Sequence, residues 1–365
     1  MKITGVEAIP LSIPYVYGAS GYVLGATRAQ VLDICLIRVE TDEGIIGWGD
    51  AFAYSSRTAV TAAVRDMVAP LALGEEARDI AGVGRKLQKA LHIFGRYGIT
   101  MHALSGLDIA LWDIAGKAAG KPLHELIGGT APVDIPAYAS LLRYADNALV
   151  AKHAARAVAE GFAAIKLHEI DEAVIAAARA AVPRNVPLMF DVNCPWTPDE
   201  AVAIAIRLAA HAPEWLEEPV FPPEDFAGLK RVRTEAGLRV AAGENWCTAV
   251  QFAQALDAGA VDIVQPSVTK LGGVTEFLNV LGLAREHGVR VAPHSPYFGP
   301  GALATLHLLT RLPQPAWFEL YYLDAEAALF GDALKPTRGR MKLPTGHGLG
   351  ADPDPHVILR YRTDQ

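Results

Sequence analysis

The sequence predicts an α/β protein in which an N-terminal α+β domain precedes a (β/α)₈ barrel or a close variant of it. From residue 131 onward, eight short apolar runs alternate with Ala-rich helical segments. From the second run on, a polar residue closes each run, at intervals of 23 to 27 residues. One strand, one helix and their two connections need about that length, so the near-constant interval indicates repeated βα units.

Residues 1–130 form the predicted α+β domain. Ile3–Pro10 and Cys35–Glu40 carry β-branched runs, and a turn at Thr41–Gly44 is expected to lead into a third run, Ile45–Trp48. Tyr15–Arg28 is rich in Gly and Tyr and is expected to form a mobile loop that could serve as a lid.

A helical pattern follows from about Ser56 to Ile127, where apolar residues recur three and four positions apart. The helix that contains Ala103–Ile114 is expected to end at the pair Gly128-Gly129. Residues 131–329 form the predicted barrel, and residues 330–365 form a C-terminal segment that is expected to pack back on the first domain. The eight predicted strand runs are Ile135–Ser140, Ala163–His168, Leu188–Asn193, Trp215–Pro219, Val240–Asn245, Asp262–Ser267, Val289–Ser295 and Trp317–Tyr321.

The composition is that of an ordinary globular enzyme, with 51% hydrophobic and 20% charged residues and a formal net charge of −7. No Lys/Arg cluster is present, which argues against nucleic acid as a partner. No apolar run is long enough to span a membrane, and the N-terminus lacks the features of a signal peptide, so the expected compartment is the cytoplasm. The three cysteines show no C-x-x-C spacing and indicate neither a disulfide framework nor a Cys-ligated zinc site.

Three consecutive βα units end their strands in acids: Asp191, Glu217 and Glu244. The carboxyl ends of barrel strands meet at the mouth, where the active sites of such barrels lie. Three carboxylates that converge there would repel one another unless a cation lay between them. Ligation by oxygen alone favours Mg²⁺, with Mn²⁺ next, so the sequence predicts a magnesium site. The alternative is three independent acids in surface loops. It is disfavoured because all three acids follow the regular interval of the predicted βα units.

Further titratable residues share this phase. Lys166 and His168 are two apart in one run, so both side chains should point the same way and depress each other's pKa. That arrangement predicts a base that works near neutral pH. His294 follows the seventh run, and Glu319 lies in the eighth and could share a proton with a substrate oxygen. The alternative for Glu319 is a buried acid paired to a neighbour.

The chain resembles the enolase superfamily, and within it the mandelate racemase / muconate lactonizing enzyme branch, over nearly its whole length. The most specific stretch is the helix Ala103–Lys117 together with Gly120–Gly129. Shorter motifs that carry the resemblance are Lys166-x-His168, Asp191-x-Asn193, Glu217-Glu218-Pro219, Gly243-Glu244-Asn245, Gln265-Pro266, Lys270-x-Gly272-Gly273, Pro293-His294 and Phe318-Glu319-Leu320.

The resemblance implies an α+β capping domain over a modified TIM barrel, with Mg²⁺ on Asp191, Glu217 and Glu244. It also implies a common first step, in which a base removes the proton α to a carboxylate and the metal stabilises the enediolate. Small-molecule carboxylates are the implied substrates, and a homo-oligomer is the implied assembly. The capping loops Tyr15–Arg28 and about Asp50–Arg57 are expected to select the substrate. The candidate substrate-binding residues are Tyr22, Tyr54, Asn193, Ser267 and Lys270.

Two positions depart from the family pattern. His168 stands where the strand motif usually has lysine, so Lys166 is expected to support His168 as the base on one face. Ser267 stands where the mandelate racemase subgroup has an Asp that pairs with the histidine after the next strand, here His294. Ser267 can hydrogen-bond His294 and fix its tautomer, but it cannot stabilise an imidazolium as a carboxylate does.

Three functions stay open on the sequence. The favoured one is dehydration of an acid sugar or hydroxy acid, with His168 or His294 as the acid. The second is racemisation or epimerisation, with the two histidines on opposite faces of the α-carbon. The third is a non-catalytic relative that binds only metal and ligand. A metal-dependent hydrolase on a similar barrel is disfavoured because it would want His ligands.

Overall fold

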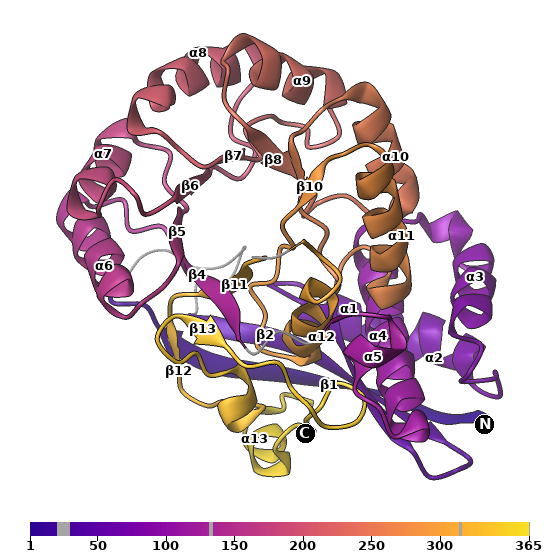
Figure 1. Ribbon diagram of the computed structural model, residues 1–365. Coiled ribbons are helices and arrows are strands. Elements are labelled where there is room, and N and C mark those ends of the chain that lie inside the picture. The colour runs from indigo at the N-terminus through magenta and orange to yellow at the C-terminus, as the bar shows by residue number, and fades with distance from the viewer. Residues whose placement is uncertain (20–29, 131–133, 314–315, 365) are drawn as a thin grey trace.

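The structure is a computed structural model that describes residues 1–19, 30–130, 134–313 and 316–364. At its centre eight parallel strands form a ring, with helices around the outside (Figure 1). The strands follow one another in chain order from β4 to β10, and β11 pairs with β4 on the other side. Along the described chain no ladder joins β10 to β11, so the barrel is open at that seam. The strands are β4 (Ile135–Leu141), β5 (Ala164–Leu167), β6 (Leu188–Asp191), β7 (Leu216–Glu217), β8 (Val240–Ala242), β9 (Ile263–Val264), β10 (Arg290–Val291) and β11 (Phe318–Tyr321).

The predicted barrel is therefore confirmed, because each predicted apolar run overlaps one of these strands. Helices connect the strands outside the ring, and three of them begin at an Asp whose carboxylate accepts a backbone N–H of the first turn: Asp146, Asp171 and Asp225. Thr197 and Glu200 form a reciprocal capping box on a fourth. The helices are α6 (Asn147–Ala159), α7 (Glu172–Ala181), α8 (Pro198–Leu208), η3 (Ala209–His211), α9 (Phe226–Glu235), α10 (Thr248–Ala258), α11 (Gly273–Glu286) and α12 (Pro300–Leu309).

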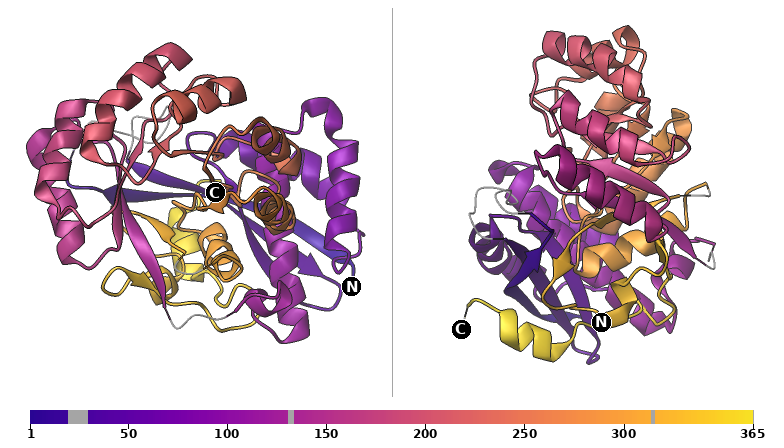
Figure 2. Two further views of the ribbon diagram at one scale, coloured as in Figure 1. Left: turned by 45° about the horizontal axis from the view of Figure 1, so that its top comes forward. Right: turned by 90° about the vertical axis from the view of Figure 1, so that its left-hand side faces the viewer.

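The N-terminal part of the chain is an antiparallel sheet with helices on one side (Figure 2). The predicted turn at Thr41–Gly44 is confirmed, with Gly44 N donating to Thr41 O at 3.0 Å. The strands are β1 (Ile3–Val16), β2 (Val31–Thr41) and β3 (Ile46–Phe52), and the helices are α1 (Arg57–Ala63), η1 (Val64–Val68), α2 (Ala69–Ala72), α3 (Ile80–Ala90), η2 (His92–Phe94), α4 (Gly98–Ala119) and α5 (Leu123–Leu126).

Two expectations for this part of the chain were wrong. Helix α4 does not run on to Gly128; it ends at Ala119 because Gly120 adopts the left-handed conformation with φ of 64°. The expected loop at Tyr15–Arg28 starts too early, because Tyr15 and Val16 still belong to β1, where they pair with β12 (Asp324–Ala325). Residues 20–29, which include Tyr22, lie outside the described part of the chain.

The end of the chain returns to the first sheet. After β12 come η4 (Gly331–Leu334), β13 (Arg340–Met341), which pairs with β4, and α13 (Pro355–Tyr361). Just beyond α13, Thr363 N donates to Pro10 O at 3.0 Å, and the Arg362 guanidinium lies 3.2 Å from the Glu7 carboxylate. None of the described helices combines the length and apolar character that crossing a membrane requires.

The first sheet contacts helix α4 at glycines. A Cβ added to Gly49 on β3 would lie 1.8 Å from the backbone oxygen of Gly106, and one added to Gly47 would lie 2.2 Å from that of Ala110. The strand and the helix therefore approach more closely than any side chain would permit. Beside this contact, the Asp113 carboxylate accepts hydrogen bonds from Trp48 N at 2.9 Å and Leu349 N at 2.8 Å.

We predict that Gly49→Ala lowers the free energy of unfolding by about 1–3 kcal/mol, because the added methyl group forces β3 and α4 apart. The matched control is Gly282→Ala on α11, where an added Cβ meets nothing within 4 Å. It should raise the free energy of unfolding by up to about 1 kcal/mol, since alanine favours the helix. Urea unfolding followed by circular dichroism measures both. Equal stability of the two variants would contradict the close packing.

Candidate active site and metal centre

The polar centre of the barrel rests on an apolar floor. One residue from each strand region forms that floor: Tyr138, Ala164, Met189, Trp215, Ala241, Ile263 and Ala292, with Trp317 packed against them. Side chains two residues apart in a strand point to the same side. Each polar residue of the next layer therefore lies above a floor residue: Ser140 above Tyr138, Lys166 above Ala164, Asp191 above Met189, Glu217 above Trp215 and Glu319 above Trp317.

Lys166 is the hub of this layer. Its Nζ lies 3.0 Å from Asp191 Oδ2, 2.8 Å from Glu217 Oε1 and 2.8 Å from Glu319 Oε1, and all four side chains are fully buried. Burial alone would lower the pKa of Lys166, but the charges of these three carboxylates outweigh it and raise the pKa well above its ordinary value. The expectation that Lys166 and His168 depress each other's pKa was therefore wrong for the lysine, whose ammonium is locked in a carboxylate cage.

The acids outnumber the cations around this hub. Burial and the charge of Asp191 raise the pKa of Glu217 well above its usual value. Burial would also raise the pKa of Asp191, but Lys166 and His168 outweigh it and lower that pKa. Neighbouring carboxylates at this distance cannot all ionise unless more positive charge is added.

One oxygen each from Asp191, Glu217 and Glu244 lies within 4.8 Å of the others. Glu244 reaches this group because the chain leaves β8 at Gly243, whose φ of 135° is one that side-chain-bearing residues rarely adopt. Asp191 Oδ2 is buried and makes no well-aligned hydrogen bond to any described residue, although Lys166 Nζ and His168 Nε2 lie nearby. An excess of negative charge, a buried oxygen without a well-aligned hydrogen bond and an all-carboxylate donor set fit a hard divalent cation.

His168 faces this centre from β5. Its Nδ1 lies 2.7 Å from the backbone oxygen of Leu141, and its Nε2 lies 3.2 Å from Asp191 Oδ2. A carbonyl oxygen can only accept, so Nδ1 carries a proton, and Nε2 is the ring nitrogen that faces the centre.

His294 lies in the segment after β10, and β10 stands across the ring from β5 (Figure 1). Its Nε2 lies 2.9 Å from Glu244 Oε2, and its Nδ1 lies 3.0 Å from Ser267 Oγ. The two histidines therefore contact different members of the carboxylate group.

Glu319 lies below the mouth rather than in it. It is fully buried and, besides Lys166, it accepts hydrogen bonds from Ser140 Oγ at 2.9 Å and from Ser295 N at 3.0 Å. Glu319 is therefore a buried acid paired to its neighbours, which is the alternative that the sequence left open for it. Burial opposes ionisation, but Lys166 and His294 outweigh it and lower the pKa of Glu319.

The candidate substrate-binding residues differ in their positions. Asn193 is exposed, and its Nδ2 donates to Asp191 Oδ1 at 2.8 Å. Lys270 is buried against the ring of Phe52, 4.7 Å from its centroid, and its Nζ donates to Asn245 Oδ1 at 3.0 Å. The ring of Tyr54 stacks on Tyr321, whose ring in turn meets the edge of His168 at 6.1 Å.

Several residues of the site were not identified as candidates from the sequence. Tyr297 contacts both Ser267 Oγ and His294 Nδ1, the latter at 3.1 Å. Trp215 donates from Nε1 to Glu217 Oε2 at 2.9 Å, which the two-residue spacing on one strand could have indicated. Gln265 is fully buried, and neither atom of its amide has a hydrogen-bond partner among the described residues.

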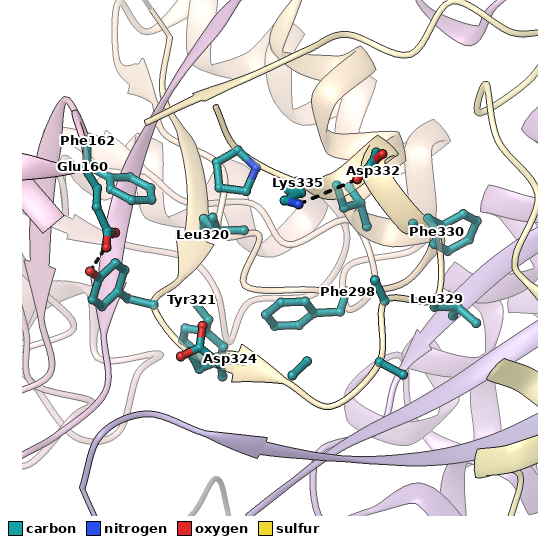
Figure 3. A pocket seen from close by; sticks show the side chains of 18 of the residues that line it. Glu160, Phe162, Phe298, Leu320, Tyr321, Asp324, Leu329, Phe330, Asp332 and Lys335 are labelled. Atoms are coloured by element: carbon teal, nitrogen blue, oxygen red, sulfur yellow. Dashed lines mark hydrogen bonds and ion pairs between the residues drawn. The ribbon is translucent and has the colours of Figure 1, made fainter. Parts of the chain in front are cut away.

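A separate cavity of about 540 Å³ lies between the end of β11 and the C-terminal segment (Figure 3). Phe298 projects toward its middle, between Tyr321 on one side and Leu329 and Phe330 on the other. None of the described residues that line it is one of the three acids or two histidines of the barrel centre.

Comparison with known proteins agrees with this geometry. Residues 149–357 match the family described as Enolase C-terminal domain-like, and residues 22–128 match the Mandelate racemase / muconate lactonizing enzyme, N-terminal domain. The chain belongs to the mandelate racemase / muconate lactonizing enzyme family. The resemblance drawn from its motifs is thereby confirmed.

Relatives within this family have known activities or ligands. The chain is 34% identical over 357 residues to D-galactarolactone cycloisomerase of Agrobacterium fabrum, covering 92% of each chain. It is 30% identical over 343 residues to arabinonate dehydratase of Saccharolobus solfataricus, covering 91% of each. A solved structure of an enolase from Bradyrhizobium, complexed with magnesium and mandelic acid, is 30% identical and covers 99% of this chain and 98% of that one, with a TM-score of 0.85.

We predict that Lys166→Met lowers the free energy of unfolding of the metal-free protein by about 3–5 kcal/mol, because it leaves buried carboxylates without their cation. Lys230→Met, at an exposed position on α9, should change it by less than about 0.5 kcal/mol. Urea unfolding in the presence of a chelator measures both. A Lys166→Met variant as stable as the wild type would show that the ammonium is not the counter-charge of the cage.

Proposed function

We propose that this chain is a Mg²⁺-dependent enzyme that removes the proton α to the carboxylate of an acid sugar or hydroxy acid and then eliminates the β-hydroxyl group. One observation carries the proposal: three convergent carboxylates lie between two imidazoles that face them from opposite sides. The dehydratase and cycloisomerase relatives, which act on sugar-acid compounds by their names, support the substrate class.

Asp191, Glu217 and Glu244 are the proposed metal ligands. A Mg²⁺ ion held there would act as a Lewis acid toward the carboxylate of the substrate and would stabilise the negative charge that develops on it. Lys166 and Glu319 lie immediately beneath; we assign Lys166 the role of a fixed positive charge beside the developing negative charge, and Glu319 the role of holding Lys166.

His168 is the proposed base, because the Leu141 carbonyl fixes the Nδ1 proton, so Nε2, which faces the centre, is the nitrogen that can take up and release a proton. Nε2 takes the α-proton, and the electron pair of the C–H bond moves onto the carboxylate to give an enediolate. That pair then forms the double bond between the α- and β-carbons as the bond from the β-carbon to its oxygen breaks. His294 is the proposed acid that protonates the departing hydroxyl, so water leaves. The resulting enol gains a proton on carbon and becomes a 2-keto acid.

Asn193, Lys270 and Tyr54 are the proposed substrate contacts, with Ser267 acting through His294. We also keep Tyr22 as a candidate contact on the grounds of its sequence position alone.

Epimerisation, or an isomerisation that starts with the same proton removal, is the second candidate. The opposite placement of the two imidazoles supports epimerisation, and the similarity to D-galactarolactone cycloisomerase supports isomerisation. Both keep all atoms of the substrate, whereas dehydration releases water.

We predict that the wild type converts some aldonic or aldaric acids to 2-keto acids in the presence of Mg²⁺ and that His168→Ala lowers kcat by about 10²–10⁴-fold. The screen is run in D₂O and followed by proton NMR, which reports product and α-proton exchange together. His287→Ala, at an exposed position after α11, is the matched control and should keep full activity. His294→Ala should slow release of water more than α-proton exchange.

Exchange without a keto product would replace dehydration by epimerisation or isomerisation. A wild type that neither exchanges nor converts any acid of a broad library, yet binds Mg²⁺, would make the chain a non-catalytic relative.

We predict separately that Glu244→Gln weakens Mg²⁺ binding at least about tenfold, because it removes one charged ligand from the three. Isothermal titration calorimetry on the metal-free protein measures this. Glu286→Gln, an exposed acid at the end of α11, is the matched control and should leave the affinity unchanged. The proposed ligand set is wrong if both variants bind Mg²⁺ like the wild type.

A further inference from the structure

The Nδ1 edge of His294 is held by two hydroxyl groups rather than one. Ser267 Oγ lies 3.0 Å from Nδ1, Tyr297 Oη lies 3.1 Å from Nδ1, and the two hydroxyls are in hydrogen-bond contact with each other. Ser267 and Tyr297 are both buried, so no bulk water competes for these contacts. The three groups form a closed triangle, in which each hydroxyl has one proton to donate and lone pairs to accept.

We propose that Tyr297 is a positioning residue for His294. The hydroxyl groups of Ser267 and Tyr297 together orient the imidazole ring through Nδ1, because Ser267 alone is too small to do so. The proposal rests on the proposed role of His294 and names a residue that acts through it.

The other edge of His294 decides the direction of these hydrogen bonds. Nε2 lies 2.9 Å from Glu244 Oε2, and a carboxylate accepts, so Nε2 carries a proton. Whenever the ring is neutral, Nδ1 is then an acceptor and needs a donor. Burial raises the pKa of Tyr297, so its hydroxyl keeps its proton, and the pair can direct one O–H at Nδ1 while the other O–H closes the triangle. A pair of hydroxyls therefore fixes the Nε2–H form of His294, the form with its proton toward the site.

The capping domain fixes the position of Tyr297. The ring of Phe52 meets that of Tyr297 edge-on at 6.3 Å, and Tyr54 Oη donates to Pro296 O, the residue before Tyr297, at 2.5 Å. Phe52 N also donates to Thr269 O at 3.3 Å in the segment that follows Ser267. The end of β3 and the segment that follows it thus contact both barrel loops that carry the hydroxyl pair.

A purely structural role for Tyr297 makes a different prediction. The ring of Tyr297 packs edge-on against both Phe52 and His294, the latter at 5.7 Å, and a phenylalanine would keep both contacts. Tyr297→Phe therefore removes the hydroxyl and leaves the packing. If packing were the whole role, this variant would behave like the wild type.

The test follows His294 directly in the metal-free full-length protein by ¹⁵N NMR of labelled histidines, with the His294 signals among the 11 histidines assigned by their loss in His294→Gln. We expect the wild type to show the Nε2–H tautomer, and Tyr297→Phe to shift the Nδ1 resonance and mix the tautomers. Tyr361→Phe, whose hydroxyl donates to Glu326 on the periphery, is the matched control and should leave His294 unchanged.

Kinetics supply a second measurement with Mg²⁺ and a sugar acid that the wild type converts. Tyr297→Phe should lower kcat about tenfold with KM within about twofold, and Ser267→Ala should lower kcat similarly. In the double variant kcat should fall by less than the product of the two single-variant factors, because both hydroxyls act on one nitrogen. Ser267→Thr, which keeps a hydroxyl, should show the Nε2–H tautomer of His294 in the NMR spectrum, as the wild type does.

An unchanged Nδ1 resonance in Tyr297→Phe overturns the proposal, whatever the activity. A wild type that converts no acid refutes the proposed function instead, and the NMR measurement still decides the role of Tyr297. A changed resonance with an unchanged kcat would show that the hydroxyl contacts His294 without positioning it for the reaction, and the proposal would again be wrong.

Discussion

The structure depends most on the cage of carboxylates that closes on one buried ammonium. Asp191, Glu217 and Glu319 all reach Lys166 Nζ within 3.0 Å, in a barrel interior from which water is excluded. Isolated buried charges are costly, so such a group persists only if its members compensate one another. One ammonium cannot neutralise three carboxylates, and burial together with the charge of Asp191 raises the pKa of Glu217. The remaining demand for positive charge is what a divalent cation would meet, which links the stability of the barrel centre to the proposed chemistry.

The barrel and the first sheet contribute differently to this centre. The strands place the charges, because alternation along each strand sets one inward side chain above another. The connections after the strands place the histidines, and those connections are held from outside the barrel. Tyr54 bonds to the segment after β10, and Gly301 N donates to the Asp50 carboxylate at 3.4 Å. The end of β3 and the segment after it therefore fix the geometry around His294, while the Leu141 carbonyl of β4 fixes that of His168.

The sequence was sufficient to predict the barrel, its eight strands and the residues at their carboxyl ends, because period-two alternation and strand spacing are local properties. It was insufficient wherever a contact crosses the barrel. The pKa of Lys166 was misjudged because only its neighbour His168 was considered, and the acids that raise the pKa come from three other strands. Tyr297 was missed because its role depends on a loop shaped by Phe52 and Tyr54, more than 240 residues earlier in the chain. The end of α4 was misplaced because Gly120 and Gly128 are equivalent as sequence signals: both have positive φ, and Gly120 ends α4 whereas Gly128 follows the short helix α5.

The environments of the two histidines bear on the choice between elimination and epimerisation. A two-base epimerase needs a lone pair on one imidazole and a proton on the other. The two imidazoles must exchange these roles when the substrate has the opposite configuration at the α-carbon. Here the Nδ1 atoms face different partners: a carbonyl that can only accept at His168, and a hydroxyl pair that can donate at His294. The first arrangement retains the Nδ1 proton in every state of His168, whereas the second favours a proton on Nε2 of His294. That asymmetry suits a reaction with one base and one acid in fixed roles, which is what elimination of water requires.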